Sequence, residues 1–273
     1  MDRLKQAMKA FELDGLPEKL TETAIASLWR THDGRVLKLY HGDTMESEAS
    51  GVSLLQSWPD TAVQIVATTP NAVLMEHLPG NTLGDLFRSG FGDEADRHLS
   101  DLALRAHATA LPVQDPLPTL DIWFEALFNL ALHADCPMAL RHNMERATQL
   151  AQTLVSSPQS DWRPLHGDLH HDNVLEGADG YRAIDAKGVF GARGYELANA
   201  VRNPKGAEGH LLNAEFQTHR ITRFADAMGI SVKEQTQWAA AKCALSIAWR
   251  AKGMLKADKE ADLLDLLLSL SER

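Results

Sequence analysis

The stretch LHGDLHHDNVL, residues 165–175, decides how the rest of the chain is interpreted. It holds three histidines, two aspartates and one asparagine within eleven residues. Such a composition suits a metal cage, a nucleophile site, or a loop built around one general base. The residues that follow it in the chain separate these three alternatives.

A β-hairpin is predicted directly after this stretch. An apolar run begins after Asn173, a glycine-containing turn follows, and a second apolar run ends at Asp185. Two antiparallel strands joined by such a turn bring Asp185 back beside Asn173. Asp168 lies five residues before Asn173, next to Gly167, which permits a tight bend. We therefore expect three oxygen-bearing side chains to converge at one end of the hairpin.

The chemistry of these three side chains suits phosphoryl transfer. Asp185 and Asn173 supply hard oxygen ligands for Mg²⁺, an ion that usually also holds waters and substrate phosphates. Asp168 is then free to accept a proton from an incoming hydroxyl. Phosphoryl transfer requires this division of labour, because its catalysis is mostly positioning and charge neutralisation.

The competing interpretations of the stretch are weaker. His170 and His171 are adjacent and point apart in extended backbone, and no HExxH or cysteine pair supports a zinc site. A Ser-His-Asp hydrolase needs a G-x-S-x-G elbow, which the chain lacks. A plain surface loop remains open for the motif taken alone, since short motifs match by accident. The position of Asp185, at the end of the second strand of the predicted hairpin, argues against a plain surface loop.

The motif HGDLHHDN, residues 166–173, matches the catalytic loop of protein-kinase-like phosphotransferases, H-x-D followed by four residues and Asn. With AIDAKGVFGARGYELAN, residues 183–199, and AVRNPKG, residues 200–206, it resembles the aminoglycoside and hydroxyurea resistance kinases. That group contains the streptomycin phosphotransferases. DPKG is usual in the group where eukaryotic protein kinases carry Asp-Phe-Gly, and Ala186 here stands in place of the proline.

The resemblance implies a role for each residue that matches the motif. Asp168 would be the catalytic base, and Asn173 and Asp185 would be the Mg²⁺ ligands. His166 would brace the loop as a scaffold residue. Glu196 would hydrogen-bond the catalytic loop from below. ATP and Mg²⁺ are the cofactors that these roles imply.

A looser resemblance over residues 21–80 concerns the nucleotide. A kinase-like site needs a strand lysine to hold the α- and β-phosphates and a helical glutamate to orient it. Lys38 lies between apolar residues on a predicted strand, and Glu48 follows in the next predicted helix. Glu46 competes with Glu48 for the place of the partner.

The adenine is expected at the segment LMEHLPG. Met75 would line the back of the pocket, and the carbonyl of Glu76 and the N–H of Leu78 would hydrogen-bond the base edge. The chain has no G-x-G-x-x-G and no G-x-x-x-x-G-K-[ST]. Ser27 and residues 21–23 are therefore the candidates to cover the phosphates.

The pattern along the chain predicts an α+β, two-lobed, protein-kinase-like fold. A small antiparallel β-rich N-terminal lobe, residues 1–78, would bind the nucleotide, and a break at Pro79 and Gly80 would start a larger, mainly helical lobe, residues 79–273. The catalytic loop and the acceptor site would belong to the second lobe. Strands are expected within residues 26–31, 35–41 and 62–78, and helices within 43–58, 93–111, 119–133, 138–157, 215–229, 233–253 and 260–272.

Composition excludes several classes of protein. A net charge of −10 over 273 residues argues against general nucleic-acid binding, which needs a basic surface. Cys136 and Cys243 are the only cysteines, so no disulfide framework is expected. The N-terminal residues do not form an apolar signal core, and no window has the apolar length of a membrane span. The expected location is the cytoplasm.

Together these features predict a small-molecule kinase that moves the γ-phosphoryl group of ATP to a hydroxyl. The resemblance implies a streptomycin-type aminoglycoside or hydroxyurea as acceptor. Choline, ethanolamine, fructosamine and homoserine kinases share the loop, so these acceptors stay open, as does the oligomeric state. A nucleotide-binding pseudokinase regulator is a further alternative, which the complete set of Lys38, Asp168, Asn173 and Asp185 disfavours. The acidic residues that the helical lobe offers to a cationic acceptor are Glu208, Asp226, Glu234 and Asp258.

Overall fold

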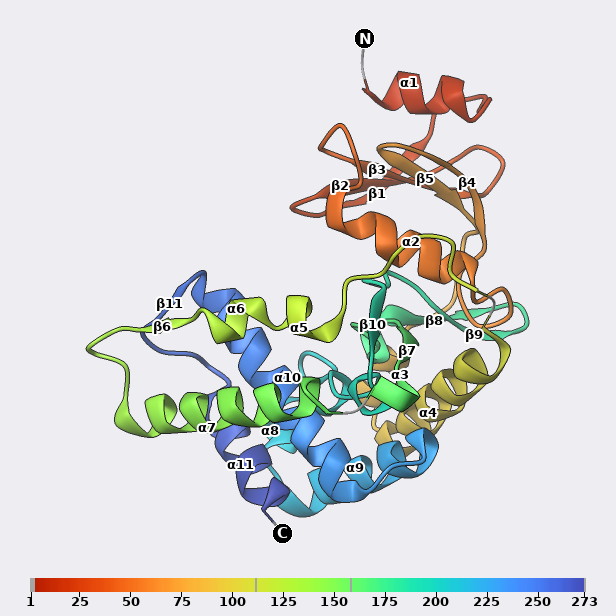
Figure 1. The fold of residues 1–273 in the computed structure, drawn as a ribbon. Helices are drawn as coiled ribbons and strands as arrows, with labels where there is room; N and C mark the ends of the chain where they lie inside the picture. The colour runs from red at the N-terminus through yellow and green to blue at the C-terminus, as the bar shows by residue number, and fades with distance from the viewer. Residues whose placement is uncertain (1–2, 111, 158, 273) are drawn as a thin grey trace.

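The computed structural model describes residues 3–110, 112–157 and 159–272. The chain forms a β-rich N-terminal part joined to a larger, mainly helical C-terminal part (Figure 1). Within the described residues, no helix has both the length and the apolar character needed to cross a membrane.

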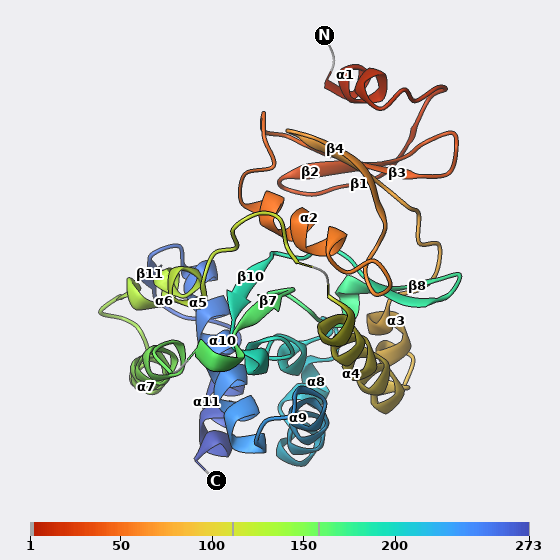
Figure 2. The ribbon, with the colours of Figure 1, turned by 45° about the vertical axis from the view of Figure 1, so that its right-hand side comes forward.

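The N-terminal part is a five-stranded antiparallel sheet in the order β1-β2-β3-β5-β4. Helix α1 covers one face, and helix α2 lies on the other face, between the sheet and the C-terminal part (Figures 1 and 2). The elements are α1 (Arg3–Ala10), β1 (Glu18–Glu22), β2 (Ala26–Arg30), β3 (Val36–Tyr40), α2 (Ala49–Gln56), β4 (Ile65–Thr69) and β5 (Ala72–Met75).

Strand β3 shows why Lys38 points toward the interior of the molecule. Side chains alternate between the two faces of a strand. Leu37 and Leu39 belong to an apolar cluster with α1, whereas Tyr40 packs in a second cluster with Val52 of α2. Lys38 therefore lies on the α2 face, which is turned toward the C-terminal part.

Helix α10 is the centre of the C-terminal part, packed against α7, α9 and α11. It starts at Ser231, whose side chain accepts a hydrogen bond from the N–H of Glu234, as an N-cap does. Residues 238–248 are all buried, so the helix reads as a core helix with a lysine, Lys242, inside it. The helices are α3 (Leu83–Arg88), α4 (Gly92–Thr109), α5 (Leu120–Trp123), α6 (Glu125–Phe128), α7 (Met138–Val155), α8 (Glu208–Leu211), α9 (Ala214–Met228), α10 (Val232–Ala251) and α11 (Ala261–Ser271).

Three short strand pairs complete the C-terminal part. The pair β7–β10 and the pair β8–β9 are antiparallel, and the pair β6–β11 is parallel. Their bounds are β6 (Ala131–Leu132), β7 (Arg163–Leu165), β8 (Val174–Gly177), β9 (Gly180–Ala183), β10 (Val189–Gly191) and β11 (Met254–Leu255).

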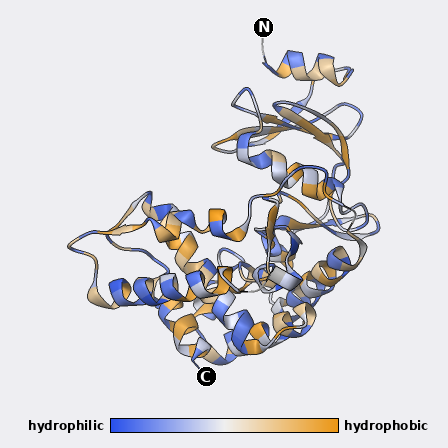
Figure 3. Cartoon of the chain, viewed as in Figure 1, coloured by the Kyte–Doolittle hydropathy of each residue, from blue (hydrophilic) through white to orange (hydrophobic). Residues whose placement is uncertain are grey.

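The outer helices show the two-sided pattern that the sequence predicts. In α7 the buried apolar positions include Leu140, Met144, Ala147, Ala151 and Leu154, which recur at helical spacing. Figure 3 shows hydrophobic and hydrophilic residues mixed along this helix and along α9. One side of each helix therefore packs on the core while the other meets solvent.

Two of the expected helices differ from the structure. Residues 119–133 form two one-turn helices, α5 and α6, followed by strand β6, because Ala131 and Leu132 pair with β11 far along the chain. Residues 43–58 become α-helical only from Ala49, after a short 3₁₀ turn, Glu46–Glu48. Strand β1 was not expected, since EKLTE is a polar, fully exposed edge strand without alternating apolar residues.

The two parts are joined by more than the chain itself. The N–H of Val63 donates to the carbonyl of Ala183 at 2.9 Å, and the N–H of Ala183 donates to the carbonyl of Thr61 at 2.8 Å. Trp58 and Leu78 share one apolar cluster with residues of the C-terminal part. The loop after α2 is thereby held against the β8–β9 hairpin, which carries the predicted site.

Candidate active site

The predicted hairpin exists and positions the polar residues at its base. Strands β8 and β9 pair antiparallel with Val174 opposite Ala183. The N–H of Ile184 donates to the carbonyl of Asn173 at 2.9 Å, one position before Asp185. Asn173 and Asp185 therefore leave the hairpin side by side, as the sequence indicates.

His166 ties the catalytic loop to the residues before Asp185. Its ring Nε2 lies 2.9 Å from the carbonyl of Ile184, and its Nδ1 accepts the N–H of Asp168 at 3.3 Å. These partners assign the proton to Nε2. Burial lowers the pKa of His166, which keeps the ring neutral. The residue acts on the geometry of the loop, with no face open to a substrate.

Glu196 lies beneath the same loop. Both oxygens of its buried carboxylate accept the backbone N–H of His166 at 3.1 Å, and Oε2 lies 2.9 Å from Nε2 of His107 on α4. A carboxylate that is fully buried needs such partners, because an unpaired buried charge is costly. Glu196 thus links the loop to helix α4.

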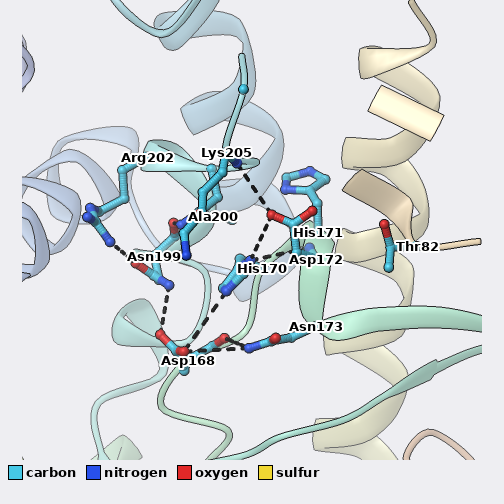
Figure 4. A network of polar contacts seen from close by, with 12 residues as sticks. Thr82, Asp168, His170, His171, Asp172, Asn173, Asn199, Ala200, Arg202 and Lys205 are labelled. Atoms are coloured by element: carbon cyan, nitrogen blue, oxygen red, sulfur yellow. Dashed lines mark hydrogen bonds and ion pairs between the residues drawn. The ribbon is translucent and has the colours of Figure 1, made fainter. Parts of the chain in front are cut away.

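Asp168 faces a cavity and is held from the side by amides (Figure 4). The side-chain nitrogen of Asn199 donates to Oδ1 of Asp168 at 2.8 Å, and that of Asn173 donates to the backbone carbonyl of Asp168 at 3.0 Å. Arg202 donates to the oxygen of Asn199 at 2.9 Å, which fixes the orientation of this amide. Oδ2 of Asp168 has one long contact, from the side-chain nitrogen of Asn173 at 3.5 Å, and keeps a further lone pair for a hydroxyl.

The second histidine of the motif lines the same cavity. Nδ1 of His170 accepts the N–H of Asp172 at 3.2 Å, and Nε2 lies 4.0 Å from Oδ2 of Asp168. Burial lowers the pKa of His170 to about 4, so the ring is neutral and turns its Nε2–H toward the carboxylate. His171 points the other way, and its Nε2 lies 2.8 Å from Oδ1 of Asp96 on helix α4.

Lys38 reaches across from the N-terminal sheet. Its Nζ lies 2.8 Å from Oδ1 of Asp185 and 3.7 Å from Glu48, whereas Glu48 accepts from Lys187 at 2.9 Å. Burial would lower the pKa of Lys38, but Asp185 outweighs this effect and the pKa is raised. The glutamate predicted for Lys38 is therefore shared with a second lysine. Glu46 is exposed, so Glu48 is the glutamate that faces the site.

A narrow cavity of about 30 Å³ lies between the sheet, helix α2 and the segment that begins at Asp185. It is lined by Lys38, Asp185 and apolar side chains that include Met75. Within residues 3–110, 112–157 and 159–272, nothing hydrogen-bonds to the carbonyl of Glu76 or the N–H of Leu78. The N–H of Glu76 donates to Gln64 instead. One backbone acceptor and one donor are therefore free beside Met75.

The glycine-poor turn between β1 and β2 is held by its own side chains. The hydroxyl of Thr23 accepts from the N–H of Ala26 at 3.1 Å, and the hydroxyl of Ser27 accepts from the ring N–H of Trp29 at 2.9 Å. The hydroxyls of Thr23 and Ser27 thus have partners within the β1–β2 hairpin. The adjacent backbone remains the part of the turn that could approach a phosphate.

A larger cavity of about 660 Å³ opens beside Asp168. Helix α10, the segment after β10, and α8 supply most of its wall, and Lys187 and Glu48 close the side toward Lys38 and Asp185. Of the acidic residues predicted to receive a cationic acceptor, Glu208 lines this cavity. Asp226 lines a separate shallow pocket, and Asp258 is paired with Arg250 at 2.7 Å.

Two oxygen ligands for a divalent cation are in place. The amide nitrogen of Asn173 is used by Asp168, which leaves its amide oxygen for a cation, and Asp185 presents a carboxylate beside it. Among the described residues, no group of three or more His, Cys, Asp or Glu side chains is arranged to hold a metal. A donor set of this size fits Mg²⁺, which completes its shell with waters and phosphates.

The site contains residues that the sequence motif did not indicate. Asn199, Lys187, Arg202 and Lys242 all line the cavity beside Asp168. Asn199 and Lys187 lie within the motif stretch, but their partners are distant in the chain. Lys242 had its own signal, a lone lysine inside the alanine-rich, fully apolar stretch of a predicted helix.

The N-terminal end of α2 packs directly on the segment DAKG. A Cβ added to Gly51 would lie 1.7 Å from the carbonyl oxygen of Ala186. We expect Gly51→Ala to lower the free energy of unfolding by about 1–3 kcal/mol, as overpacking does, and to reduce turnover by displacing Asp185. Denaturant unfolding and a kinetic assay measure the two effects.

The matched control for this substitution is Gly209→Ala. A Cβ there would meet nothing within 4 Å, and the glycine lies in helix α8. Its free energy of unfolding should change by less than about 1 kcal/mol, in the stabilising direction. Equal losses of stability in both variants would show that the close contact between α2 and DAKG does not exist.

The two-lobed fold, the strand lysine and the Asp168, Asn173 and Asp185 cluster together define a small-molecule kinase of the protein-kinase-like fold. The family model described as aminoglycoside/hydroxyurea antibiotic resistance kinase matches residues 17–253. The chain belongs to this family. The expectations of a two-lobed α+β fold and of a small-molecule kinase are confirmed.

Relatives with assigned activities agree with this result. Streptomycin 3''-kinase from Klebsiella pneumoniae is 32% identical over 237 residues, which cover 81% of this chain and 86% of that protein. Choline kinase LicA from Streptococcus pneumoniae matches with a TM-score of 0.67 and 14% identity, over 97% of this chain and 98% of that chain. Aminoglycoside phosphotransferase APH(3'')-Id from Streptomyces rimosus, in complex with ADP and streptomycin, matches with a TM-score of 0.58 and 15% identity, over 90% of this chain and 99% of that chain.

Proposed function

We propose that this protein is an ATP- and Mg²⁺-dependent kinase that phosphorylates a hydroxyl of a small molecule. The observation that carries the proposal is the convergence of Asp168, Asn173 and Asp185, with Lys38 reaching Asp185 at 2.8 Å from the opposite sheet. A base, two oxygen ligands and a phosphate-binding lysine are the parts that phosphoryl transfer requires.

The nucleotide is proposed to bind at the cavity between the sheet, helix α2 and Asp185. Met75 would contact the adenine, and the free carbonyl of Glu76 and N–H of Leu78 would recognise its edge. On nucleotide binding, Lys38 would leave its ion pair with Asp185 and contact the α- and β-phosphates. Glu48 would keep the Lys38 side chain oriented. Solved structures of similar fold contain GDP, ADP or AMP, which supports a nucleotide at this place.

Asp185 and the amide oxygen of Asn173 would hold Mg²⁺, which would neutralise charge on the β- and γ-phosphates. His166 contributes by holding the backbone at Asp168 close to the residue before Asp185, since it bonds both the carbonyl of Ile184 and the N–H of Asp168. Lys187 adds a positive charge 3.8 Å from Asp185, on the side of the acceptor cavity.

Asp168 is proposed as the base of the transfer step. Oδ2 accepts the proton of the acceptor hydroxyl as the hydroxyl oxygen bonds to the γ-phosphorus, and the bond from that phosphorus to the β-bridging oxygen breaks, releasing ADP. Asn199 holds the carboxylate in line by its bond to Oδ1. The protein supplies orientation and charge complementarity, and no covalent enzyme intermediate is needed.

The boundary between the two lobes and the cellular location of the protein are also part of this proposal. Residues 1–78 would act as the nucleotide-binding lobe, and residues 79–273 would carry the catalytic loop and the acceptor cavity. We expect the protein to act in the cytoplasm, where ATP and Mg²⁺ are available. Nucleic acid and membranes are not expected partners.

The acceptor classes come from the relatives. A streptomycin-type aminoglycoside or hydroxyurea follows from the family, and the 32% identity to streptomycin 3''-kinase supports it. A metabolite kinase with an acceptor like choline, ethanolamine, fructosamine or homoserine is the alternative, supported at the level of the fold by choline and ethanolamine kinases. ATP consumption measured over these compounds tests the activity, and consumption that no acceptor stimulates would favour a pseudokinase regulator.

The metal assignment gives a direct prediction. ATP with Mg²⁺ should raise the melting temperature of the protein, by an amount equivalent to about 2.7 kcal/mol at a hundredfold excess over Kd, and chelation of Mg²⁺ should remove most of it. Asp185→Asn should abolish the Mg²⁺-dependent part. Differential scanning fluorimetry measures each shift.

The control is Asp179→Asn, the same chemical change at the exposed tip of the β8–β9 hairpin. It should keep the full Mg²⁺-dependent shift. If Asp185→Asn and Asp179→Asn give the same shift, Asp185 does not bind the metal–nucleotide complex.

A further inference from the structure

The cavity beside Asp168 carries the opposite charge balance to the whole chain. The net charge of the chain is −10, yet cationic side chains outnumber acidic ones around this cavity. The acidic side chains there are Glu48, Asp168, Glu208 and Glu260. The cationic side chains are Lys187, Arg202, Lys205, Lys242, Arg250 and Lys259.

Two of the four acidic side chains, Glu48 and Glu260, are already engaged in ion pairs with cations of the wall. Glu48 pairs with Lys187 at 2.9 Å, and Glu260 pairs with both Arg202 at 2.6 Å and Arg250 at 2.8 Å. A cationic ligand would have to displace one of these pairs to gain Glu48 or Glu260, whereas Glu208 is exposed and accepts the N–H of Gly206 at 3.1 Å. Glu48 and Glu260 offset two of the three positive charges that they contact, and six cationic against four acidic lining side chains leave the wall with an excess of two positive charges.

Lys242 is the cation nearest the proposed base. It projects from the middle of α10, is 1% exposed, and places Nζ 3.8 Å from Oδ1 of Asp168. The same Nζ lies 4.3 Å from the ring centroid of Trp249. Burial lowers the pKa of Lys242 to about 8, so the amine is still mostly protonated at neutral pH.

The position of Lys242 bears on the charge that an acceptor can carry. Carboxylates and aromatic faces are the two groups that recognise an ammonium or guanidinium ligand. At the inner end of the cavity both Asp168 and Trp249 already face a lysine of the protein. A hydroxyl placed on Oδ2 of Asp168 brings the neighbouring carbons of its own molecule close to Nζ of Lys242, so a positive group there would be repelled.

We infer that the acceptor is a polyhydroxyl compound with an anionic group, a carboxylate or a phosphate, close to the hydroxyl that is phosphorylated, and that Lys242 binds this group. The inference rests on the proposed function, because it uses the same cavity and the same base. Lys205 and Lys259 line the cavity at exposed positions and extend the positive wall outward. Among the acceptor classes of the proposed function, this inference favours a polyhydroxyl metabolite over an aminoglycoside, whose amines are protonated at neutral pH.

A matched series of compounds tests the charge preference. D-gluconate, D-glucitol and 1-amino-1-deoxy-D-glucitol share one carbon chain and differ at C1 in carrying a negative, a neutral and a positive group, and D-glucitol 6-phosphate separates a phosphate from a carboxylate. Binding is measured by calorimetry on the enzyme alone, and kcat/KM by ADP release. The anionic compounds should exceed the amine by about tenfold or more in both measurements, which corresponds to about 1.4 kcal/mol.

Substitution of the lysine separates its charge from its bulk. Lys242→Met keeps the length of the side chain and removes the charge, and it should reduce the preference for gluconate over the amine to about twofold or less. Lys242→Arg should retain the preference. The control is Lys233→Met, which makes the same change at an exposed position of α10 and should leave the preference as in the wild-type protein. Thermal melting shows that each variant is folded.

The outcomes distinguish this inference from the proposed function. Turnover of the amine in preference to gluconate leaves the kinase assignment standing and overturns the anionic acceptor. Preferred binding of the anionic compounds without turnover supports the charge of the cavity and counts against the kinase assignment. Failure of both gluconate and glucitol 6-phosphate to bind at millimolar concentration overturns the inference, as does an unchanged preference in Lys242→Met.

Discussion

Asp168→Asn should lower kcat by about 10²- to 10⁴-fold, the contribution expected of a positioned general base. The side-chain amide has nearly the same shape as the carboxylate, so the loop should keep its backbone bonds to His166 and Asn173. What is lost is an oxygen that can accept the proton of the acceptor hydroxyl. The affinity for ATP with Mg²⁺ should change little, since Lys38 and Asp185 are intact.

The measurement is acceptor-dependent ADP release together with nucleotide-dependent thermal stabilisation. Asp172→Asn is the matched control in the same loop, because Asp172 contacts Arg88 at 2.8 Å and the backbone of Lys205 and does not line the acceptor cavity. It should keep kcat within a few-fold. Near-normal turnover in Asp168→Asn would remove the base from the mechanism, whatever the result for nucleotide binding.

Asp96→Asn should destabilise the protein by about 3–5 kcal/mol, the cost of leaving one member of a buried ion pair without its partner. Arg220 is fully buried and donates to Asp96 at 2.8 and 3.0 Å, while Nε2 of His171 lies 2.8 Å from the same carboxylate. Asp96 belongs to α4, Arg220 to α9 and His171 to the catalytic loop. The cluster therefore fixes the back of the loop to two helices.

Chemical denaturation measures this loss, and Asp93→Asn is the control three positions earlier on the same helix. Asp93 pairs with Arg223 and with His219, but its side chain is 66% exposed, so its substitution should cost less than about 1 kcal/mol. The double variant Asp96→Asn/Arg220→Met should be destabilised by clearly less than the sum of the single variants. Additive losses would show that the two charges do not interact.

The same cluster predicts how stability depends on pH. Burial would raise the pKa of Asp96, but Arg220 and His171 outweigh it and bring the pKa to about 2, from an ordinary value of 3.8. A carboxylate with a depressed pKa contributes stability that is fully present above its unfolded pKa and is lost as pH falls through the folded value. The wild-type protein should therefore lose stability between pH 3.8 and about pH 2, and Asp96→Asn should lose less over this range.

The sequence determined those parts of the protein that are encoded by near neighbours in the chain. The turn between two short apolar runs brings Asp185 beside Asn173, and a spacing of five residues returns Asp168 to the same point. The apolar residues on either side of Lys38 likewise indicate a strand, whereas the structure shows on which face of the sheet Lys38 lies. Each of these inferences needs only the period of a strand or the geometry of a turn.

Elements whose partners are distant were harder to predict. Residues 119–133 have an apolar stripe typical of a helix, but part of the segment becomes strand β6 because β11 offers it a backbone partner. The competing hydrogen bonds come from more than a hundred residues away, so no local pattern could reveal them. For the same reason the sharing of Glu48 between Lys38 and Lys187 emerged only from the structure.

The charge of the acceptor cavity is the clearest case of a property that only the tertiary structure decided. The composition of the chain is acidic and suggests a cationic partner, and the helical lobe does contain acidic residues. Folding pairs Glu260 with two arginines and directs Lys242 from the core of α10 to within 3.8 Å of Asp168. The sequence motif identifies the proposed catalytic groups, because these groups are close in sequence. The surroundings of the substrate are assembled from helices that meet only in the folded chain, where charges act through space.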